Sequence, residues 1–193
     1  MAVTPSTMLD LGTRAPEFAL PDAVTGKSVS LADSADADAL LVAFWCNHCP
    51  YVIHIEDAFV AFAREYAERG LAVVAIGSND ADKYPQDGPA AMRERATQKA
   101  YPFPYLHDAT QEVAKAYRAA CTPDLFLFDR DRELVYRGQF DGSRPGSGAP
   151  VTGAALRAAA DSVLAGADVD GEQTPSIGCN IKWKRGHEPE WFG

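Results

Sequence analysis

The residues best suited to chemistry in this chain are two cysteines in the tetrad Cys46-Asn47-His48-Cys49. A thiolate attacks one sulfur of a disulfide, and a nearby second thiol can then attack the mixed disulfide and release the product. Two cysteines at this spacing are therefore typical of dithiol-disulfide exchange. We predict that Cys46 is the exposed nucleophile and that Cys49 is the more buried resolving thiol.

The elements on either side of the tetrad would favour a thiolate. The apolar run from Ala39 to Trp45 has the length of a strand and suits one that is covered on both faces. Apolar residues then recur at helical spacing from Pro50 to Arg69. Cys46 should therefore lie near the unpaired N–H groups of the first helical turn, which favour an anion together with the helix dipole. His48, when protonated, would add a second stabilising charge.

Two other interpretations of the cysteines stay open. Free cysteines pack as small hydrophobic residues, so the pair could be structural. A zinc site would need four ligands, but the other two cysteines, Cys121 and Cys179, are isolated and show no paired spacing. The pair follows an aromatic strand end and precedes Pro50, which favours redox chemistry with no metal and no cofactor.

The rest of the chain supplies the elements of an α/β domain. The predicted order is a buried strand, a loop, a helix, a short strand, a helix, an antiparallel hairpin and a last helix. A mixed sheet with a parallel half and helices on both faces follows from this order. The segments are Leu71 to Gly77, Ser78 to Pro89, Ala90 to Ala100, Tyr105 to Leu106, Thr110 to about Ala119, Asp124 to Phe140 and Val151 to Ala165.

Composition and charge exclude several classes of function. The 193 residues are 47% hydrophobic and 23% charged, as in an ordinary globular domain. A net charge of -9 argues against nucleic acid and anionic membranes as partners. We find no secretory signal pattern and no run approaching the roughly 20 apolar residues of a membrane span. We therefore expect a cytoplasmic protein, in which four cysteines would stay reduced unless they cycle.

Several segments resemble the thioredoxin-like superfamily, in its redoxin and peroxiredoxin-like (AhpC/TSA) branch. They are APEFALPD, FWCNHCP, AIGSND, LHDATQEVAKAY, CTPDLFLFD and LVYRGQFD, and the tail PSIGCNIKWK resembles a group of uncharacterised bacterial peroxiredoxin-like proteins. The resemblance implies an α/β thioredoxin-like fold over residues 11–166, with a mixed central β-sheet flanked by helices. Residues 1–10 would form an N-terminal extension, and residues 167–193 an irregular C-terminal tail that packs on the domain.

The resemblance also implies roles for residues outside the tetrad. It places Pro123 as a cis-proline that faces the dithiol, with the backbone of Thr122 available to pair with an extended substrate chain. The alternative is an ordinary trans proline that begins a strand. Trp45 would be core, groove wall or both. Cys121 and Cys179 could each be a third redox thiol or an inert packed one, and the tail that carries Cys179 could fold back over the site.

One departure from the family pattern concerns peroxide chemistry. Peroxiredoxins carry a Pro and then a Thr or Ser at fixed spacings before the peroxidatic cysteine. With Cys49 in that role, these places hold Val42 and Cys46, and with Cys46 in that role they hold Ala39 and Ala43. The peroxide-activating residues are missing in both alignments, which counts against fast peroxide reduction.

A second departure concerns proton transfer and redox potential. The buried acid that thioredoxins carry six residues before the first cysteine is Leu40 here, so a base for Cys49 is not identified. His48 replaces the proline of thioredoxins, as in strongly oxidising oxidoreductases. A more stable thiolate raises the reduction potential, so we expect a more oxidising pair than that of thioredoxin. In the alternative, His48 is solvated and neutral near pH 7.

The sequence therefore predicts a thiol-disulfide oxidoreductase that contributes to cell redox homeostasis. Its substrates would be protein or small-molecule disulfides, and its reducing partner a thioredoxin or glutathione system. One alternative is a thiol peroxidase with an antioxidant role, in which a cysteine sulfenic acid condenses with a neighbouring thiol. Another is a thioredoxin-fold binding module whose thiols are incidental.

Overall fold

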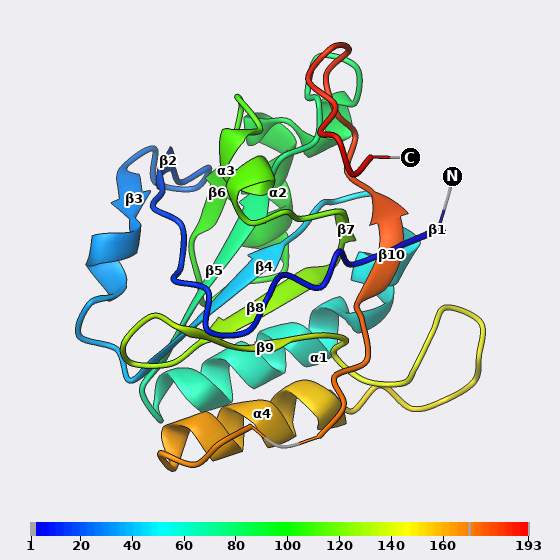
Figure 1. Ribbon diagram of the computed structural model, residues 1–193. Coiled ribbons are helices and arrows are strands. Elements are labelled where there is room, and N and C mark those ends of the chain that lie inside the picture. Colours follow the sequence, from blue (N-terminus) through cyan, green and yellow to red (C-terminus); the bar gives the residue numbers. More distant parts are fainter. Residues whose placement is uncertain (1–2, 170, 193) are drawn as a thin grey trace.

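A five-stranded mixed sheet organises the chain in the computed structural model, which describes residues 3–169 and 171–192 (Figure 1). Residues 1, 2, 170 and 193, which belong to the two predicted tails, lie outside the described residues. The strands β6, β5 and β4 are parallel neighbours, and β8 pairs antiparallel with both β4 and β9, so the predicted mixed sheet is confirmed. Their order is β6 (Tyr105–His107), β5 (Leu71–Gly77), β4 (Ala39–Phe44), β8 (Asp124–Phe128) and β9 (Leu134–Arg137).

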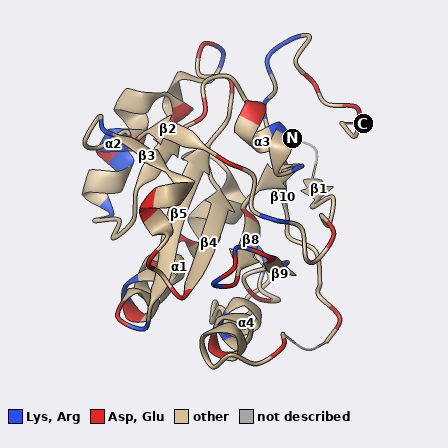
Figure 2. Cartoon of the chain, turned by 60° about the vertical axis from the view of Figure 1, so that its left-hand side comes forward, with Lys and Arg blue, Asp and Glu red and all other residues tan. Residues whose placement is uncertain are grey.

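The strand β4 is fully buried in this sheet. All six of its residues are 0% exposed, and neither β4 nor β5 carries a charged residue (Figure 2). Alternate side chains of a strand point to opposite faces. Leu41 and Ala43 therefore join one hydrophobic cluster, and Leu40, Val42 and Phe44 join the other. Because both faces are packed, the chain leaves the end of β4 at a fixed point.

Helices cover both faces of the sheet. Residues of α1 (Pro50–Ala67), α2 (Pro89–Gln98) and α4 (Ala154–Leu164) pack in one cluster, and α3 (Glu112–Ala116) packs in the other. Figure 1 shows α1 and α4 lying side by side below the sheet. Among the described residues, no helix combines the length and apolar character that a membrane crossing requires.

The helix predicted from Thr110 to Ala119 is shorter than expected. It begins at Glu112, because the preceding residue Gln111 has a left-handed backbone (φ 66°) and cannot be part of the helix. The side-chain amide of Gln111 donates to the carbonyl oxygens of Ser78 at 2.6 Å and Lys182 at 3.0 Å. These tertiary hydrogen bonds hold Gln111 out of the helix.

Short elements complete the chain around the main sheet. The opening segment pairs β2 (Ala19–Pro21) with β3 (Ser28–Ser30) as an antiparallel ribbon, followed by the 3-10 helix η1 (Leu31–Ser34). A second 3-10 helix, η2 (Pro85–Asp87), lies within the predicted loop between β5 and α2. This loop carries Asp87, a residue of the candidate site.

The C-terminal tail, predicted as irregular, contains a strand, and the prediction is wrong there. The strand β10 (Ile177–Asn180) lies between β1 (Val3–Pro5) and β7 (Cys121–Thr122) in a three-stranded antiparallel sheet (Figure 1). Four residues are too few to show a strand period in sequence, and the unpaired edge of β7 supplies the hydrogen bonds that order them. The division into a domain at 11–166 and two tails stays a prediction.

The approach of β10 to β7 depends on Gly178. A Cβ atom at this position would overlap the backbone carbonyl of Thr122 and lie 3.3 Å from Cδ of Pro123. We expect Gly178→Ala to lower the free energy of unfolding by about 1–3 kcal/mol, because overpacking forces the backbone to shift. Urea unfolding measures the change. Gly142→Ala is the matched control, since a Cβ there meets nothing within 4 Å, and an equal loss in both variants would contradict the close packing.

Candidate active site

The site forms where β4 passes into α1. Cys49 has an extended backbone (φ -71°, ψ 122°) and caps α1, with Pro50 as the first helical residue. Proline suits this place because the first helical N–H has no partner within the helix. The N–H of Val52, another free donor of the first turn, donates to the sulfur of Cys49. The helix start therefore stabilises Cys49, and the prediction that it stabilises Cys46 is wrong.

Two sulfurs and one residue of β7 form the centre of the site. Sγ of Cys46 lies 3.2 Å from Oγ1 of Thr122, and Sγ of Cys49 lies 3.0 Å from the carbonyl oxygen of Thr122. The two sulfurs also hydrogen-bond to each other. The peptide bond between Thr122 and Pro123 is cis. Cys46 is 1% exposed and Cys49 is 0% exposed, so the prediction that Cys46 is the exposed thiol is wrong.

The surroundings place the negative charge of the pair on Cys49. A hydrogen bond from the Cys46 thiol, together with those from the α1 amide and from Cys179, outweighs burial and lowers the pKa of Cys49 to about 5. The same hydrogen bond, burial and the carboxylate of Asp87 raise the pKa of Cys46 well above its usual value. When Cys49 is protonated, it can donate to the Thr122 carbonyl. Within the pair, the lowered pKa therefore belongs to Cys49 and the raised pKa to Cys46.

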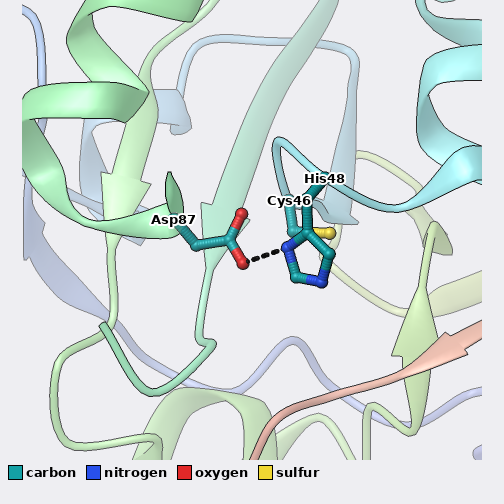
Figure 3. Close-up of side chains that lie close together, drawn as sticks. All are labelled: Cys46, His48 and Asp87. Atoms are coloured by element: carbon teal, nitrogen blue, oxygen red, sulfur yellow. Dashed lines mark ion pairs between the residues drawn. The ribbon is translucent and has the colours of Figure 1, made fainter. Parts of the chain in front are cut away.

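His48 is held by an acid from the loop between β5 and α2. Its Nδ1 lies 2.6 Å from Oδ2 of Asp87, the last residue of η2 (Figure 3). Asp87 also accepts hydrogen bonds at 2.8 Å from the N–H of Asn47 and from the side chain of Asn79. Burial raises the pKa of Asp87, but these hydrogen bonds outweigh it and the pKa is lowered. Asp87 is therefore a carboxylate that fixes the ring of His48 and the backbone of the motif.

Three potential metal ligands meet at this place. The sulfur of Cys46, a ring nitrogen of His48 and an oxygen of Asp87 all lie within 4.8 Å of one another. Two ligands of one tetrahedral zinc ion would sit about 3.3 Å apart, given bonds of about 2.0 Å. The 2.6 Å contact between His48 and Asp87 is shorter than that and is typical of an ion pair. These three residues could hold a metal ion only after His48 and Asp87 move apart.

The predicted substrate groove is filled by the protein itself. Trp45 is 0% exposed, and its Nε1 donates to the hydroxyl of Tyr101 at 3.1 Å. Trp45 is therefore a core residue and does not line a groove. Thr122 pairs with Cys179 in the ladder between β7 and β10. The edge beside Pro123, where we expected an extended substrate chain, therefore carries the C-terminal strand.

The two remaining cysteines differ in their relation to the dithiol. Cys121 is fully buried, its Sγ lies 3.5 Å from the carbonyl oxygen of Pro123, and burial raises its pKa. Cys179 is 5% exposed, and both its thiol and its N–H donate to the sulfur of Cys49. Burial and the hydrogen bond to Cys49 raise the pKa of Cys179 to about 12. Cys179 is therefore a protonated thiol in contact with the pair.

Sequence reasoning missed the acids around the motif. Asp87 lies in a stretch with several acids, and nothing in its spacing shows which of them meets His48. Asp124 follows Pro123 directly and is 0% exposed, and burial raises its pKa to about 7. The signal available for Asp124 was a single acid at the start of an otherwise apolar strand. It stands on β8, whereas the thioredoxin pattern looks for an acid on β4.

This chain is similar to one protein family and to several solved structures. The model of the AhpC/TSA family matches residues 11–137. A search of curated proteins returned no match. A hypothetical protein from Sinorhizobium meliloti is 57% identical, with a TM-score of 0.93, over 95% of this chain and 100% of the other. An uncharacterized conserved protein from Geobacillus kaustophilus is 52% identical, with a TM-score of 0.94, over 95% of this chain and 97% of the other.

More distant likenesses confirm the predicted fold. The peroxidoxin BcpB from Mycobacterium tuberculosis is 20% identical, with a TM-score of 0.56, over 81% of this chain and 95% of the other. At this identity the match concerns the fold alone. Together with the family match, it confirms a thioredoxin-like fold of the redoxin and peroxiredoxin-like type.

The charge distribution predicts how the reduced pair titrates. We expect one thiolate to appear with a midpoint near pH 5 and the second only above pH 9, because Cys49 has the lowered pKa and Cys46 the raised one. Ultraviolet thiolate absorbance measures both steps. Since the pKa of Cys49 in the unfolded chain is the higher one, the stability that this thiolate contributes is lost as pH falls through about 5.

Single variants assign this titration to a residue. Cys49→Ser should abolish the step near pH 5, and Cys121→Ala is the control that should keep it. A low step that survives Cys49→Ser would show that the charge rests on Cys46 instead.

Proposed function

The chain belongs to the AhpC/TSA family, and from this premise we propose that it is a thiol-disulfide oxidoreductase whose redox-active pair is Cys46 and Cys49. The observation that carries the proposal is the meeting of the two sulfurs at Thr122 beside the start of α1, with Sγ of Cys46 3.2 Å from its Oγ1 and Sγ of Cys49 3.0 Å from its carbonyl oxygen. There, hydrogen-bond donors lower the pKa of Cys49. Buried structural cysteines need no such donors, since they pack as neutral thiols. A thiolate beside a second thiol is the arrangement that disulfide exchange requires.

In the proposed reaction the Cys49 thiolate attacks one sulfur of a substrate disulfide. The substrate S–S bond breaks, the first product leaves as a thiol after taking up a proton, and Cys49 is left in a mixed disulfide. Cys46 then loses its proton and attacks the sulfur of Cys49. The bond between Cys49 and the substrate sulfur breaks, the second product leaves as a thiolate that takes up a proton, and the Cys46–Cys49 disulfide forms. The ring of His48 lies within 4.8 Å of the Cys46 sulfur and is proposed to accept that proton.

The cycle closes when an external thiol reduces the Cys46–Cys49 disulfide. A thioredoxin or glutathione system is the proposed source of electrons, and a cytoplasmic location belongs to the proposal because such systems work there. The low pKa of Cys49 stabilises the reduced form. A stabilised reduced form makes a stronger oxidant, so the potential is expected above about -270 mV, the thioredoxin value.

The first test is a redox titration of the wild-type protein in glutathione and dithiothreitol buffers, followed by alkylation and mass spectrometry. We expect a reversible Cys46–Cys49 disulfide with a potential above about -270 mV. A potential at or below that value would refute the oxidising character assigned to the pair. Two thiols that stay alkylatable under all conditions would refute the function.

Trapping of mixed disulfides identifies the attacking sulfur. Cys46→Ser removes the resolving thiol and Cys179→Ser removes the other thiol that touches Cys49, so the double variant should accumulate an adduct of glutathione or of a small aromatic disulfide at Cys49. Cys49→Ser should accumulate little. The reverse pattern would assign the attack to Cys46, as the resemblance to the superfamily implied. Cys121→Ala, which should turn over as the wild type does, is the control.

Thiol peroxidase activity is the second candidate, and the lowered pKa of Cys49 at the start of α1 is the observation that favours it. A peroxide would oxidise this thiolate to a sulfenic acid and release water or an alcohol, and Cys46 would condense with it to a disulfide. The place of the peroxidatic proline is held by Val42, which is buried in β4. We therefore expect stopped-flow peroxide consumption at the rate of an ordinary thiolate. A rate several orders of magnitude faster would make peroxide the substrate.

A further inference from the structure

We propose that Cys179 is a third redox thiol, which forms a disulfide with Cys49 and so gives this sulfur two alternative partners. The inference rests on the proposed function, because it needs Cys49 to take part in disulfide exchange. It adds a residue from the C-terminal strand to a site whose other residues come from the main domain. Disulfide exchange would then connect the sulfurs of Cys46, Cys49 and Cys179, with Cys49 as the shared partner of the other two.

The geometry brings Cys179 to the dithiol by an ordered route. β10 pairs with β7 in a register that places Cys179 opposite Thr122, the residue that contacts both sulfurs of the pair. Gly178 allows this approach, since a side chain there would overlap the Thr122 carbonyl. The thiol and the N–H of Cys179 then both reach the sulfur of Cys49. A sulfur held within hydrogen-bond reach of a thiolate needs only a small displacement to form a bond.

The tail is fixed on both sides of this contact. β1 pairs along the other edge of β10, with Val3 opposite Cys179. Beyond β10, the N–H of Lys182 donates to Oδ1 of Asn79 at 2.8 Å, and the Lys182 carbonyl accepts the N–H of Asp80 at 2.8 Å. Cys179 is therefore held at the dithiol in the folded protein.

The exchange steps balance without a further oxidant. In the oxidised protein, Cys179 loses its proton and attacks the Cys49 sulfur of the Cys46–Cys49 disulfide. The bond between Cys46 and Cys49 breaks, Cys46 takes up the proton, and a Cys49–Cys179 disulfide forms with no net change in oxidation state. A dithiol reductant then returns Cys49 and Cys179 to thiols and is itself oxidised to a disulfide.

Cys121 shows why this role falls to Cys179. Both residues lie in the same three-stranded sheet, but Cys121 stands at the alternate position of β7 and its sulfur approaches the carbonyl of Pro123. Thr122, its neighbour, presents both its hydroxyl and its carbonyl to the dithiol. Cys121 is therefore a matched control, a buried thiol in the same sheet whose sulfur donates to the carbonyl of Pro123.

The test is disulfide mapping of non-reduced tryptic peptides after equilibration in glutathione buffers. No Lys or Arg lies between Cys46 and Cys49, so their disulfide stays within one peptide, whereas Cys121 and Cys179 each fall in another peptide. We expect Cys46→Ser to convert more than half of the protein to the form in which the Cys49 and Cys179 peptides are linked. Wild type and Cys121→Ala should contain both the internal and the linked disulfide.

The outcomes separate this inference from the proposed function. In one outcome, the wild type forms the Cys46–Cys49 disulfide, but Cys49 in Cys46→Ser becomes glutathionylated and forms no disulfide with Cys179. This outcome would overturn the role of Cys179 as a third redox thiol and leave the proposed function standing. A wild-type protein that forms neither disulfide would overturn both. If Cys46→Ser does not fold, the test uses the wild type alone. A wild type that contains the Cys46–Cys49 disulfide but no linked Cys49 and Cys179 peptides would overturn the inference.

Discussion

The buried sulfur of Cys49 at the first turn of α1, whose pKa is lowered, is the constraint on which the site depends. A buried charge is costly unless hydrogen-bond donors surround it. The donors to Cys49 come from three parts of the chain, namely the first turn of α1, the neighbouring Cys46 and the C-terminal Cys179. They converge because β4 is packed on both faces and delivers the motif to a fixed place. The charge therefore ties the helix start and the tail to the end of one strand.

The two segments that cover the dithiol, namely the loop between β5 and α2 and the strand β10, belong to one hydrogen-bonded network. On one side, the loop between β5 and α2 brings Asp87 to His48. On the other side, β10 lies along β7. Asn79 joins the two, since its side chain donates to Asp87 and accepts from Lys182 just beyond β10. Displacement of one of these segments would therefore also weaken the hydrogen bonds that hold the other.

The elements with a strong period could be predicted from sequence, and the contacts between distant residues could not. The apolar run of β4, the helical spacing of α1 and the hairpin of β8 and β9 all stand where the pattern placed them. The Cys46 to Cys49 motif was visible for the same reason, since its residues are adjacent. The roles within it were misjudged for two reasons. The helix cap falls on Cys49, and Asp87, whose carboxylate raises the pKa of Cys46, lies far along the chain in a loop without a period.

The position of the charge and the position of the tail depend on each other. The thiol and N–H of Cys179 lower the pKa of Cys49 only while β10 lies on β7. By linkage, the same interaction must make the deprotonated site hold β10 more tightly than the protonated site does. An exposed edge beside a redox pair would invite pairing with other chains, and β10 covers that edge. Oxidation of Cys49 to a disulfide removes the negative charge that its hydrogen-bond donors stabilise. The hydrogen bonds from Cys179 to Cys49 therefore hold β10 less tightly in the oxidised protein.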